Sequence, residues 1–334
     1  MKNIIKKSIS IFAMSAFIFL IACNNNKSKE ITSENESATT KEQDHVHIYA
    51  CPMHPEVTGQ EGEKCSKCGM ALEHMDEKPM AGNFQMDFKS APEILEAGKP
   101  AVLAFTPRNK NNSAQAVPLD VTHEKKIHLI AVREDLSWFN HIHPEYQEDG
   151  SYALSETFPS GGKYLLYADY KPSGSTHQLE KIEVDVKGKS ASRKTYTAIQ
   201  NTAFSNPFSV TLKPDDGKFI SNTAIHFDAV FLKNGKSFDV HQLQNYLGAK
   251  GHMVAIHMET KAYVHLHPEV EGTILHFHTN FETAGIYRVW LQFMADGKLH
   301  TTDFVIKVEP STGKVMNEEN QEHNHEHGEE GHKH

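Results

Sequence analysis

Two stretches of this sequence are copies of one another, and they decide its fold. Each copy holds a histidine that opens an apolar run and, further on, an H-x-H-P-E motif: HLIAV at 128–132 with HIHPE at 141–145, and HMVAI at 252–256 with HLHPE at 265–269. Every histidine of these motifs shifts by 124 positions between the copies. Downstream, a shift of 123 links Phe158, Gly162, Tyr164 and His177 to Phe281, Gly285, Tyr287 and His300. The duplication predicts two homologous domains, over 83–198 and 199–310.

Short apolar runs that partly alternate with polar residues indicate β-structure in both copies. Strands are expected at 126–133, 163–170 and 181–186 in the first copy, and at 253–258, 286–294 and 303–308 in the second. Turn sequences such as Asn234-Gly235 and Asp296-Gly297 separate them. About seven strands in about 100 residues are typical of an immunoglobulin-like or cupredoxin-like β-sandwich. Only short helices are expected, at 239–247 and near 119–125.

The histidines of the two copies form a pattern that suits metal binding. Residues two apart on a strand share a face, so each H-x-H motif points two imidazoles the same way, and the proline after it ends the strand. The predicted ligands are His128, His141, His143 and His177 in the first copy, and His252, His265, His267, His276, His278 and His300 in the second. The second copy is favoured, since the first has Ala153 and Ser155 where His276 and His278 stand.

Imidazoles favour copper, zinc and nickel. A blue-copper centre needs a cysteine thiolate, and no cysteine follows residue 68, so that type of site is excluded for both sandwiches. A purely structural role of the H-x-H-P motifs, with imidazoles hydrogen-bonded at a strand end, stays open as the alternative.

A compact cysteine-histidine module precedes the duplication, over 47–76. Three cysteines and one histidine make a tetrahedral ligand set, and two ligand pairs on tight knuckles are typical of a zinc ribbon. The sequence YACPMHPEV at 49–57, followed by CSKCGM at 65–70, resembles the heavy-metal-binding domain of copper- and silver-transporting ATPases and of metal-efflux adaptors. That family usually has proline where Ser66 stands.

The resemblance implies metal ligands in the module: Cys51, His54, Cys65 and Cys68, with Met53 and Met70 as thioether contributors for Cu(I). A Cys65–Cys68 disulfide and a structural zinc knuckle remain alternatives.

The two ends of the chain predict a cellular location and a disordered tail. Residues 1–22 have a basic start and an apolar stretch too short to span a bilayer comfortably, as in a signal peptide. They end in LIAC at 20–23, which resembles the lipobox of bacterial lipoproteins, so Cys23 is the expected lipidation site. Residues 23–46 read as a flexible tether and 311–334 as a disordered, histidine-rich tail. Because Asn24 replaces the aspartate of inner-membrane retention, we expect an anchor in the outer membrane, facing the periplasm or the cell surface.

The composition of the chain narrows the range of functions that it can have. The chain of 334 residues has 34 Lys+Arg against 43 Asp+Glu, a formal net charge of −9, which argues against nucleic acid as a partner. It also has 23 histidines and four cysteines, and no later apolar run approaches the ~20 residues of a membrane span. These features predict an extracytoplasmic, lipid-anchored protein that binds heavy metal ions, with copper first and zinc or silver after it. Its expected role is metal sequestration or delivery to metal-efflux components, without enzymatic activity.

Three other functions stay open. A metal-dependent extracytoplasmic enzyme is the first, with Glu145 and Glu269 beside the H-x-H-P motifs as acid-base groups. A periplasmic adaptor of a metal-efflux pump is the second, but the long heptad-bearing helices of such adaptors are missing from the sequence. A plain interaction module is the third, since immunoglobulin-like folds host many binding functions.

Overall fold

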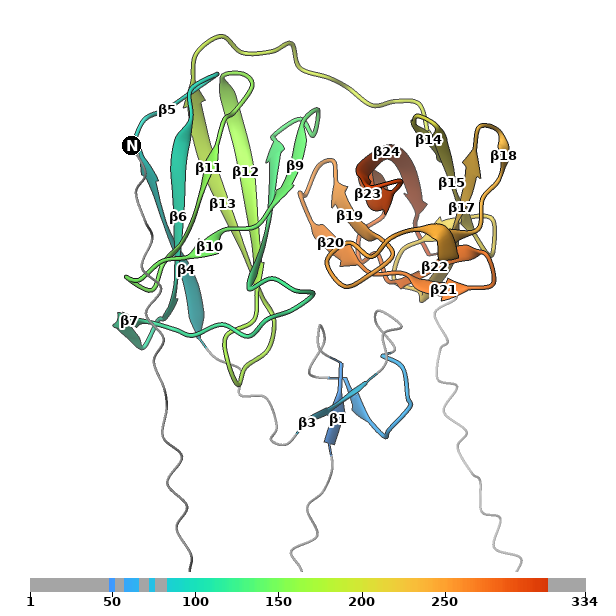
Figure 1. Ribbon diagram of the computed structural model, residues 1–334, viewed down its shortest axis with the longest axis horizontal. Helices are drawn as coiled ribbons and strands as arrows, with labels where there is room; N and C mark the ends of the chain where they lie inside the picture. Colours follow the sequence, from blue (N-terminus) through green and yellow to red (C-terminus); the bar gives the residue numbers. More distant parts are fainter. Residues whose placement is uncertain (1–47, 52–56, 66–71, 76–82, 312–334) are drawn as a thin grey trace, which may run out of the picture. The chain divides into compact units, whose positions relative to one another are not determined.

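The computed structural model of the protein describes residues 48–51, 57–65, 72–75 and 83–311. These residues form β-strands and one 3₁₀ turn, so the expected mainly β fold with two repeated sandwiches is confirmed (Figure 1). Within this part of the chain, no helix has the length and apolar character needed to cross a membrane. The predicted signal peptide, the tether and nearly all of the histidine-rich tail lie outside the described residues.

The first sandwich is built from two antiparallel-paired sheets. One has the strand order β10-β11-β6-β4 with β7 beside β6, and the other β5-β13-β12-β8-β9, in which β5 alone pairs in parallel. The strands are β4 (Phe84–Ala91), β5 (Leu95–Glu96), β6 (Ala101–Asn109), β7 (Asn112–Ala116), β8 (Ile127–Arg133), β9 (Phe139–Ile142), β10 (Glu145–Tyr146), β11 (Tyr152–Glu156), β12 (Gly162–Tyr170) and β13 (Gln178–Lys187).

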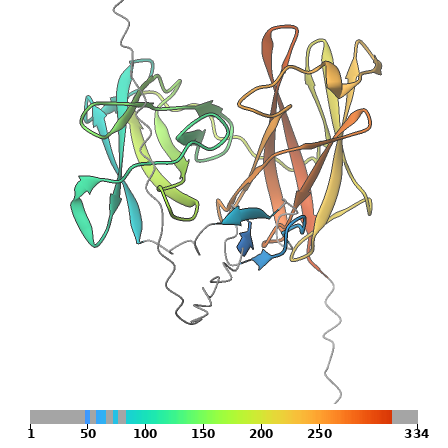
Figure 2. The same ribbon diagram turned by 60° about the horizontal axis from the view of Figure 1, so that its bottom comes forward.

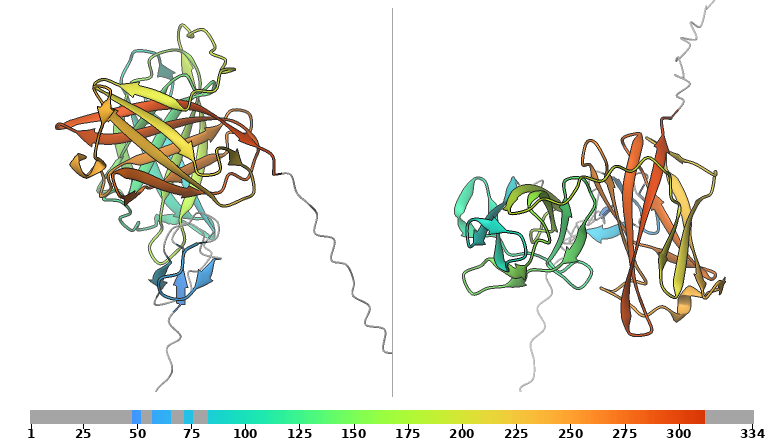
Figure 3. Two further views of the ribbon diagram at one scale, coloured as in Figure 1. Left: turned by 90° about the vertical axis from the view of Figure 1, so that its right-hand side faces the viewer. Right: turned by 90° about the horizontal axis from the view of Figure 1, so that it is seen from above.

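The second sandwich repeats this plan with one additional edge strand, β14, in the orders β14-β15-β17-β22-β21, with β18 beside β17, and β16-β24-β23-β19-β20. Figures 2 and 3 show the yellow strands β15 and β17 in one layer and the orange-red strands β23 and β24 in the other. The strands are β14 (Thr202–Ser205), β15 (Phe208–Pro214), β16 (Phe219–Ile220), β17 (Ile225–Lys233), β18 (Lys236–Ser237), β19 (His252–His257), β20 (Tyr263–Leu266), β21 (Glu269–Glu271), β22 (Ile274–Thr279), β23 (Gly285–Ala295) and β24 (Lys298–Glu309).

The expected short helices are not formed as α-helices. Only a 3₁₀ turn, η1 (Val240–Gln242), appears in the 239–247 stretch, and Asp239 caps it by accepting a hydrogen bond from the backbone N–H of His241. The 119–125 stretch contains no helix. A capping residue can order a single turn, but these segments are too short for helix propagation to add much stability.

Each sandwich has its own hydrophobic core between its two sheets. Strand β6 alternates buried positions with exposed or half-buried ones, as expected when one face of a sheet meets the core and the other meets water. Strands β8 and β19 differ, because every one of their positions is buried. Both faces of these two strands are therefore covered.

The outer face of β8 is covered by the second sandwich, and the outer face of β19 is covered by the first. Apolar residues on the outer faces of both sheets form one buried cluster that includes Ile130 and Val254. Phe139 stacks on Trp290 with ring centroids 4.6 Å apart, and Tyr167 stacks on Tyr263 at 5.1 Å. The duplication relates these two pairs to one another, so equivalent faces of the two copies pack face to face, as in an isologous dimer.

The described part of the cysteine-histidine module is a small sheet with the order β2-β1-β3. Its strands are β1 (Ile48–Ala50), β2 (Thr58–Gly59) and β3 (Glu73–Met75). The side chains of Cys51 and Cys65 are buried together with Leu72. A small sheet with two cysteines in its interior is what a zinc-ribbon-like module requires.

Candidate metal centre

Three histidines of the first sandwich bring ring nitrogens together on the face that meets the second sandwich. His128 Nδ1 and His143 Nε2 each lie 3.2 Å from His141 Nε2. His128 belongs to β8 and His141 to β9, and His143 lies two residues further on, on the same side. The three atoms form a group that could hold a metal ion.

The hydrogen bonds of the other ring nitrogens fix where the lone pairs lie. His128 Nε2 is 3.0 Å from the carbonyl oxygen of Thr122, which can only accept, so Nε2 carries the proton and Nδ1 the lone pair. His141 Nδ1 donates to Oε1 of Gln292 at 2.9 Å, and Nε2 of that amide donates to Thr301. Two lone pairs thus face each other at 3.2 Å with no proton between them, which a bound cation would stabilise.

The second sandwich carries the equivalent group in His252, His265 and His267. Each of these histidines offers one ring nitrogen, and the three nitrogens lie within 4.8 Å of one another. His252 Nδ1, His265 Nε2 and His267 Nε2 are buried without a hydrogen-bond partner. His252 Nε2 donates to the carbonyl oxygen of Tyr246 at 2.8 Å, which leaves the lone pair on Nδ1. Buried polar atoms are nearly always satisfied, so three neighbouring exceptions fit a site for a bound cation.

Each group is oriented by a residue of the opposite sandwich. His265 Nδ1 donates to Oδ2 of Asp169 at 3.1 Å, as His141 Nδ1 does to Gln292. Asp169 on β12 and Gln292 on β23 are equivalent positions of the duplication. Metal-binding histidines typically donate their second ring N–H to an acceptor of this kind, which fixes tautomer and ring orientation. Each group is therefore complete only when the two sandwiches are packed together.

The two groups lie side by side and are called here the interface histidine cluster. Its members are His128, His141, His143, His252, His265 and His267. Across the interface, ring centroids are 5.5 Å apart for His128 and His265 and 6.2 Å apart for His141 and His252. His123 stacks on His267 at 3.7 Å, and His177 Nδ1 lies 3.4 Å from Oδ1 of Asp169.

Burial favours the neutral form of three imidazoles of the cluster, those of His128, His143 and His252. It lowers the pKa of His128 to about 4 and of His252 to about 3, and the nearby imidazole of His265 acts in the same direction. Burial likewise lowers the pKa of His143 to about 3. A neutral imidazole is the form that binds metal, so at neutral pH protons do not compete for these lone pairs.

Asp169 accepts hydrogen bonds on both of its carboxylate oxygens, on Oδ2 from His265 of the cluster and on Oδ1 from the neighbouring His177. Its burial raises its pKa, but the hydrogen bonds from His177 and His265 outweigh burial and hold the pKa below its usual value. Asp169 is therefore a carboxylate, and it places a negative charge on the second group that the neutral Gln292 does not give to the first.

A third group lies on the other sheet of the second sandwich and is called here the outer-face group. It consists of His226, His276 and His278. His226 on β17 stands directly opposite His278 on β22, with ring centroids 4.4 Å apart. Asp228, the next outward residue of β17, accepts a hydrogen bond from His276 Nδ1 at 2.7 Å. His226 is exposed, so this group is open to solvent.

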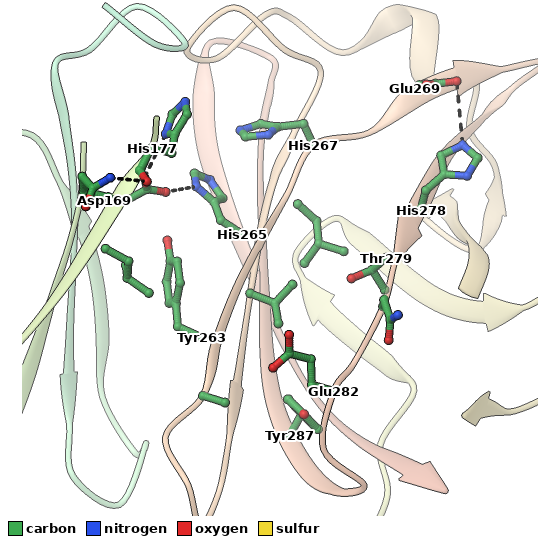
Figure 4. A pocket seen from close by; sticks show the side chains of 16 residues that line it. Asp169, His177, Tyr263, His265, His267, Glu269, His278, Thr279, Glu282 and Tyr287 are labelled. Carbon is green, nitrogen blue, oxygen red and sulfur yellow. Dashed lines mark hydrogen bonds and ion pairs between the residues drawn. The ribbon is translucent and has the colours of Figure 1, made fainter. Parts of the chain in front are cut away.

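A pocket of about 280 Å³ extends between the interface histidine cluster and the outer-face group (Figure 4). Asp169 and His265 line one end, and Glu269 and His278 line the other. His267 also faces this pocket.

The remaining predicted ligands fall into two sets. His300 is buried in the second sandwich, where its ring stacks on Phe293 at 5.1 Å and its Nδ1 lies 3.0 Å from Ser205 Oγ. Among the described residues it joins none of the metal-capable groups. The predicted ligands Met53, His54, Cys68 and Met70 lie outside the described residues, as does the predicted lipidation site, Cys23.

Five residues of these groups escaped the sequence analysis: His123, Asp169, His226, Asp228 and Gln292. His226 and Asp228 stand two apart on one strand, a spacing that places them on one face. That spacing was available from the sequence, but the pairing with β22 that completes the group was not.

A comparison with known protein families identifies the cysteine-histidine module. Residues 48–75 match the heavy metal binding domain, which confirms the expected heavy-metal-binding module. No curated protein matches the chain.

Solved structures show only remote likeness. A two-domain fibronectin type-III segment from chicken tenascin is 8% identical over 67% of this chain and 98% of its own, with a TM-score of 0.20. Salmonella alpha-2-macroglobulin reacted with methylamine is 10% identical over 79% of this chain and 19% of its own, with a TM-score of 0.25. Likeness at this level assigns no function.

The duplicated sandwiches match one family twice. Residues 73–188 and 203–310 each match the domain of unknown function DUF8832, and the two matches together cover more than half of the sequence. The chain therefore belongs to the DUF8832 family.

Proposed function

We propose that this protein binds heavy metal ions, copper first, both in its heavy-metal-binding module and in the interface histidine cluster, and that it sequesters them or delivers them to metal-efflux components. The metal is the cargo of the protein rather than a cofactor of a reaction. Metal binding by the module is supported by its family match. Metal binding by the sandwiches is supported by their own geometry.

One observation carries the proposal for the sandwiches. His252 Nδ1, His265 Nε2 and His267 Nε2 are buried with no hydrogen-bond partner, and the first copy brings ring nitrogens of the equivalent histidines, His128, His141 and His143, together in the same way. Leaving three buried nitrogens unsatisfied costs about 1–3 kcal/mol each. A structural role at a strand end would pair these nitrogens with backbone groups. In His252 the backbone hydrogen bond is made instead by the other ring nitrogen, Nε2, to the carbonyl oxygen of Tyr246.

The donor set favours copper or zinc. Each interface group offers three imidazole nitrogens, a ligand type that suits Zn and Cu, and the Irving–Williams order places Cu²⁺ above Zn²⁺ at nitrogen sites. The module adds cysteine, a soft ligand that favours Cu(I) and Zn. Together the two kinds of site suit a protein that accepts copper in either oxidation state, with zinc as a competitor.

The lipobox-like sequence that ends at Cys23 supports a place in the cell envelope, with the protein anchored by lipid to the outer membrane. Labelling with a radioactive fatty acid tests this part separately. We expect label on the wild-type protein and none on a Cys23→Ser variant, which should move to the soluble fraction. Equal labelling of both proteins would contradict the anchor.

Elemental analysis of the full-length protein purified from its membrane tests metal binding. We expect copper or zinc in the wild type, partial loss in a Cys51→Ser/Cys65→Ser/Cys68→Ser variant, and a different partial loss in a His252→Gln/His265→Gln/His267→Gln variant. His241→Gln is the matched control, because His241 is exposed and belongs to none of the groups. Full metal content in the histidine variant would remove the sandwiches from the proposal.

A metal-dependent enzyme is the second candidate. Catalytic zinc sites commonly have three protein ligands and an open position, and a pocket of about 280 Å³ reaches His265 and His267. A screen of hydrolase and oxidase substrates with the metal-loaded protein distinguishes the two. Turnover that disappears in the His265→Gln variant would favour the enzyme over the binding protein.

A further inference from the structure

The outer-face group differs from the interface histidine cluster in being reachable from solvent. Its histidines project from β17 and β22, on the face of that sheet opposite the core that contains Phe227 and Phe277. His226 is exposed, whereas His276 is buried and the side chain of His278 is 10% exposed. A metal ion from solution could therefore meet one ligand at the surface and two more beneath it.

The ring orientations in this group suit a metal ion. His276 Nδ1–H donates a hydrogen bond to Asp228, which leaves the lone pair on His276 Nε2. Both ring nitrogens of His278 are buried without a hydrogen-bond partner. One imidazole is thus oriented by a carboxylate in the manner of metal-binding histidines, and a second is left unsatisfied beside it.

The first copy shows that the fold does not need these residues. The cross-strand pairs His226–His278 and Asp228–His276 occupy the places that Val102–Ser155 and Ala104–Ala153 hold in the first sandwich. The strands pair in the same way in both copies, so the four polar side chains were added to, or lost from, an unchanged sheet. Their presence in one copy alone indicates a use beyond stability.

Glu269 connects the outer-face group to the buried group. Its carboxylate Oε2 lies 3.8 Å from His278 Nε2, and it stands directly opposite His276 in the sheet. Only Pro268 separates Glu269 from His267, whose Nε2 belongs to the buried group. The H-x-H-P-E motif therefore contributes ligands to the buried group at its start and an oxygen donor beside the outer-face group at its end.

The pocket of about 280 Å³ gives these two groups a common space. His278 and Glu269 line it from one side, and His265 and His267 line it from the other (Figure 4). A space of this size holds several water molecules, at about 30 Å³ each in the liquid, and so accommodates a hydrated or partly hydrated ion.

We propose that the outer-face group is a metal site that captures the ion from solution and passes it through this pocket to the His252–His265–His267 group. The inference rests on the proposed function, because it assumes that the buried group binds metal. The transfer is an exchange of ligands in which the metal leaves imidazoles of one group for imidazoles of the other, with Glu269 between them and no change of oxidation state. The first sandwich, without such a site, has no equivalent route.

The rate of loading tests the proposal. Trp290 stacks on Phe139 in the interface, so in a full-length Trp138→Phe background its fluorescence reports Cu²⁺ reaching the cluster by quenching. The test variant gives the outer face the residues of the first copy: His226→Val, Asp228→Ala, His276→Ala and His278→Ser. With Cu²⁺ mixed in a stopped-flow instrument, we expect quenching at least 10-fold slower than in the parent and one fewer Cu²⁺ bound per chain. The milder Asp228→Asn variant should slow loading by a smaller factor, and His241→Gln should not change it.

The possible results separate this proposal from the one on which it rests. If the four-residue variant is quenched at the parental rate or binds the parental number of Cu²⁺ ions, the capture site is wrong while metal binding by the cluster stands. If Asp228→Asn loads at the parental rate and the four-residue variant no longer folds, the capture role is also overturned. If the parent itself binds no Cu²⁺ outside the module, the proposed function fails first.

Discussion

Asp169 of the first sandwich and His265 of the second are hydrogen-bonded, with 3.1 Å between Oδ2 and Nδ1. The duplication-equivalent residues, Gln292 and His141, make the corresponding contact, with 2.9 Å between Oε1 and Nδ1. Each sandwich thus orients a central imidazole of the other, but only one of the two contacts carries a charge. Two nearly equivalent groups with different electrostatics are the main feature of this interface.

The charge of Asp169 should strengthen metal binding by the second group. Replacement of acceptors of this kind typically costs 10–100-fold in metal affinity. We expect Asp169→Asn, which keeps an acceptor but removes the charge, to weaken Cu²⁺ binding by about 10-fold. Competition titration against a chelator measures the change, and Asp185→Asn, on the exposed side of β13, is the matched control. An unchanged affinity in Asp169→Asn would show that the contact does not act on a metal.

The reverse change, from a neutral to a charged acceptor, should strengthen metal binding by the first group. Gln292→Glu gives His141 the carboxylate partner that His265 already has. The Gln292 amide now donates a hydrogen bond to the Thr301 hydroxyl, and the new carboxylate can accept one from that hydroxyl instead. We expect the weaker Cu²⁺ site to tighten by about 10-fold, so that the two sites approach one another in affinity. The same titration checks this result, and a weaker first site in Gln292→Glu would contradict the assigned role of Gln292.

Packing of the sandwiches should be required for metal binding. Trp290 is 4% exposed and stacks on Phe139, so Trp290→Ala is expected to destabilise the protein by about 3 kcal/mol. Because Asp169 and Gln292 then lose their positions, both groups should bind Cu²⁺ more weakly. Denaturant unfolding and titration measure the two effects. Phe204→Ala, at a residue that is 75% exposed, should stay within about 0.5 kcal/mol of the parent. Parental affinity in a destabilised Trp290→Ala protein would argue against a shared interface site.

Acid should destabilise the metal-free protein. The pKa values of His128 and His252 in the folded state are about 4 and about 3, below the ordinary value of 6.5. The unfolded chain therefore binds more protons between these values, so stability is present above pH 6.5 and is lost as the pH falls toward 4. Thermal melting of the metal-free protein from pH 7.5 to 4 measures this loss. His267→Leu, which removes one buried imidazole, should show a shallower dependence, and an equal slope in both proteins would contradict the prediction.

The sequence analysis correctly predicted the duplicated β-sandwiches because period-2 patterns and turn residues are local properties of the chain. The spacing of the H-x-H motifs also placed His141 with His143, and His265 with His267, on one face each, as the structure shows. Which distant strand brings a third imidazole depends on strand pairing, and the sequence does not encode pairing locally. His300 illustrates the difference, since it repeats His177 in the duplication yet lies against Phe293 and Ser205.

The contact between the sandwiches was the largest feature that the sequence analysis did not anticipate. The contact is visible in the sequence as an apolar outer face on two strands. Ile130 and Val132 make the outer face of β8 as apolar as its core face, and Val254 and Ile256 do the same for β19. Such a run shows that a second cover exists, but it does not say that the cover is the other copy. Asp169 and Gln292 therefore read as ordinary polar strand residues until both sheets are in place.

The most direct test of the central claim is an anomalous-difference map, recorded at the copper absorption edge, from crystals of the full-length protein loaded with copper. The account predicts a peak about 2.0–2.2 Å from His252 Nδ1, His265 Nε2 and His267 Nε2, with a second, weaker peak at the equivalent position among His128, His141 and His143. Copper found only at the module, with both interface groups empty, would contradict it.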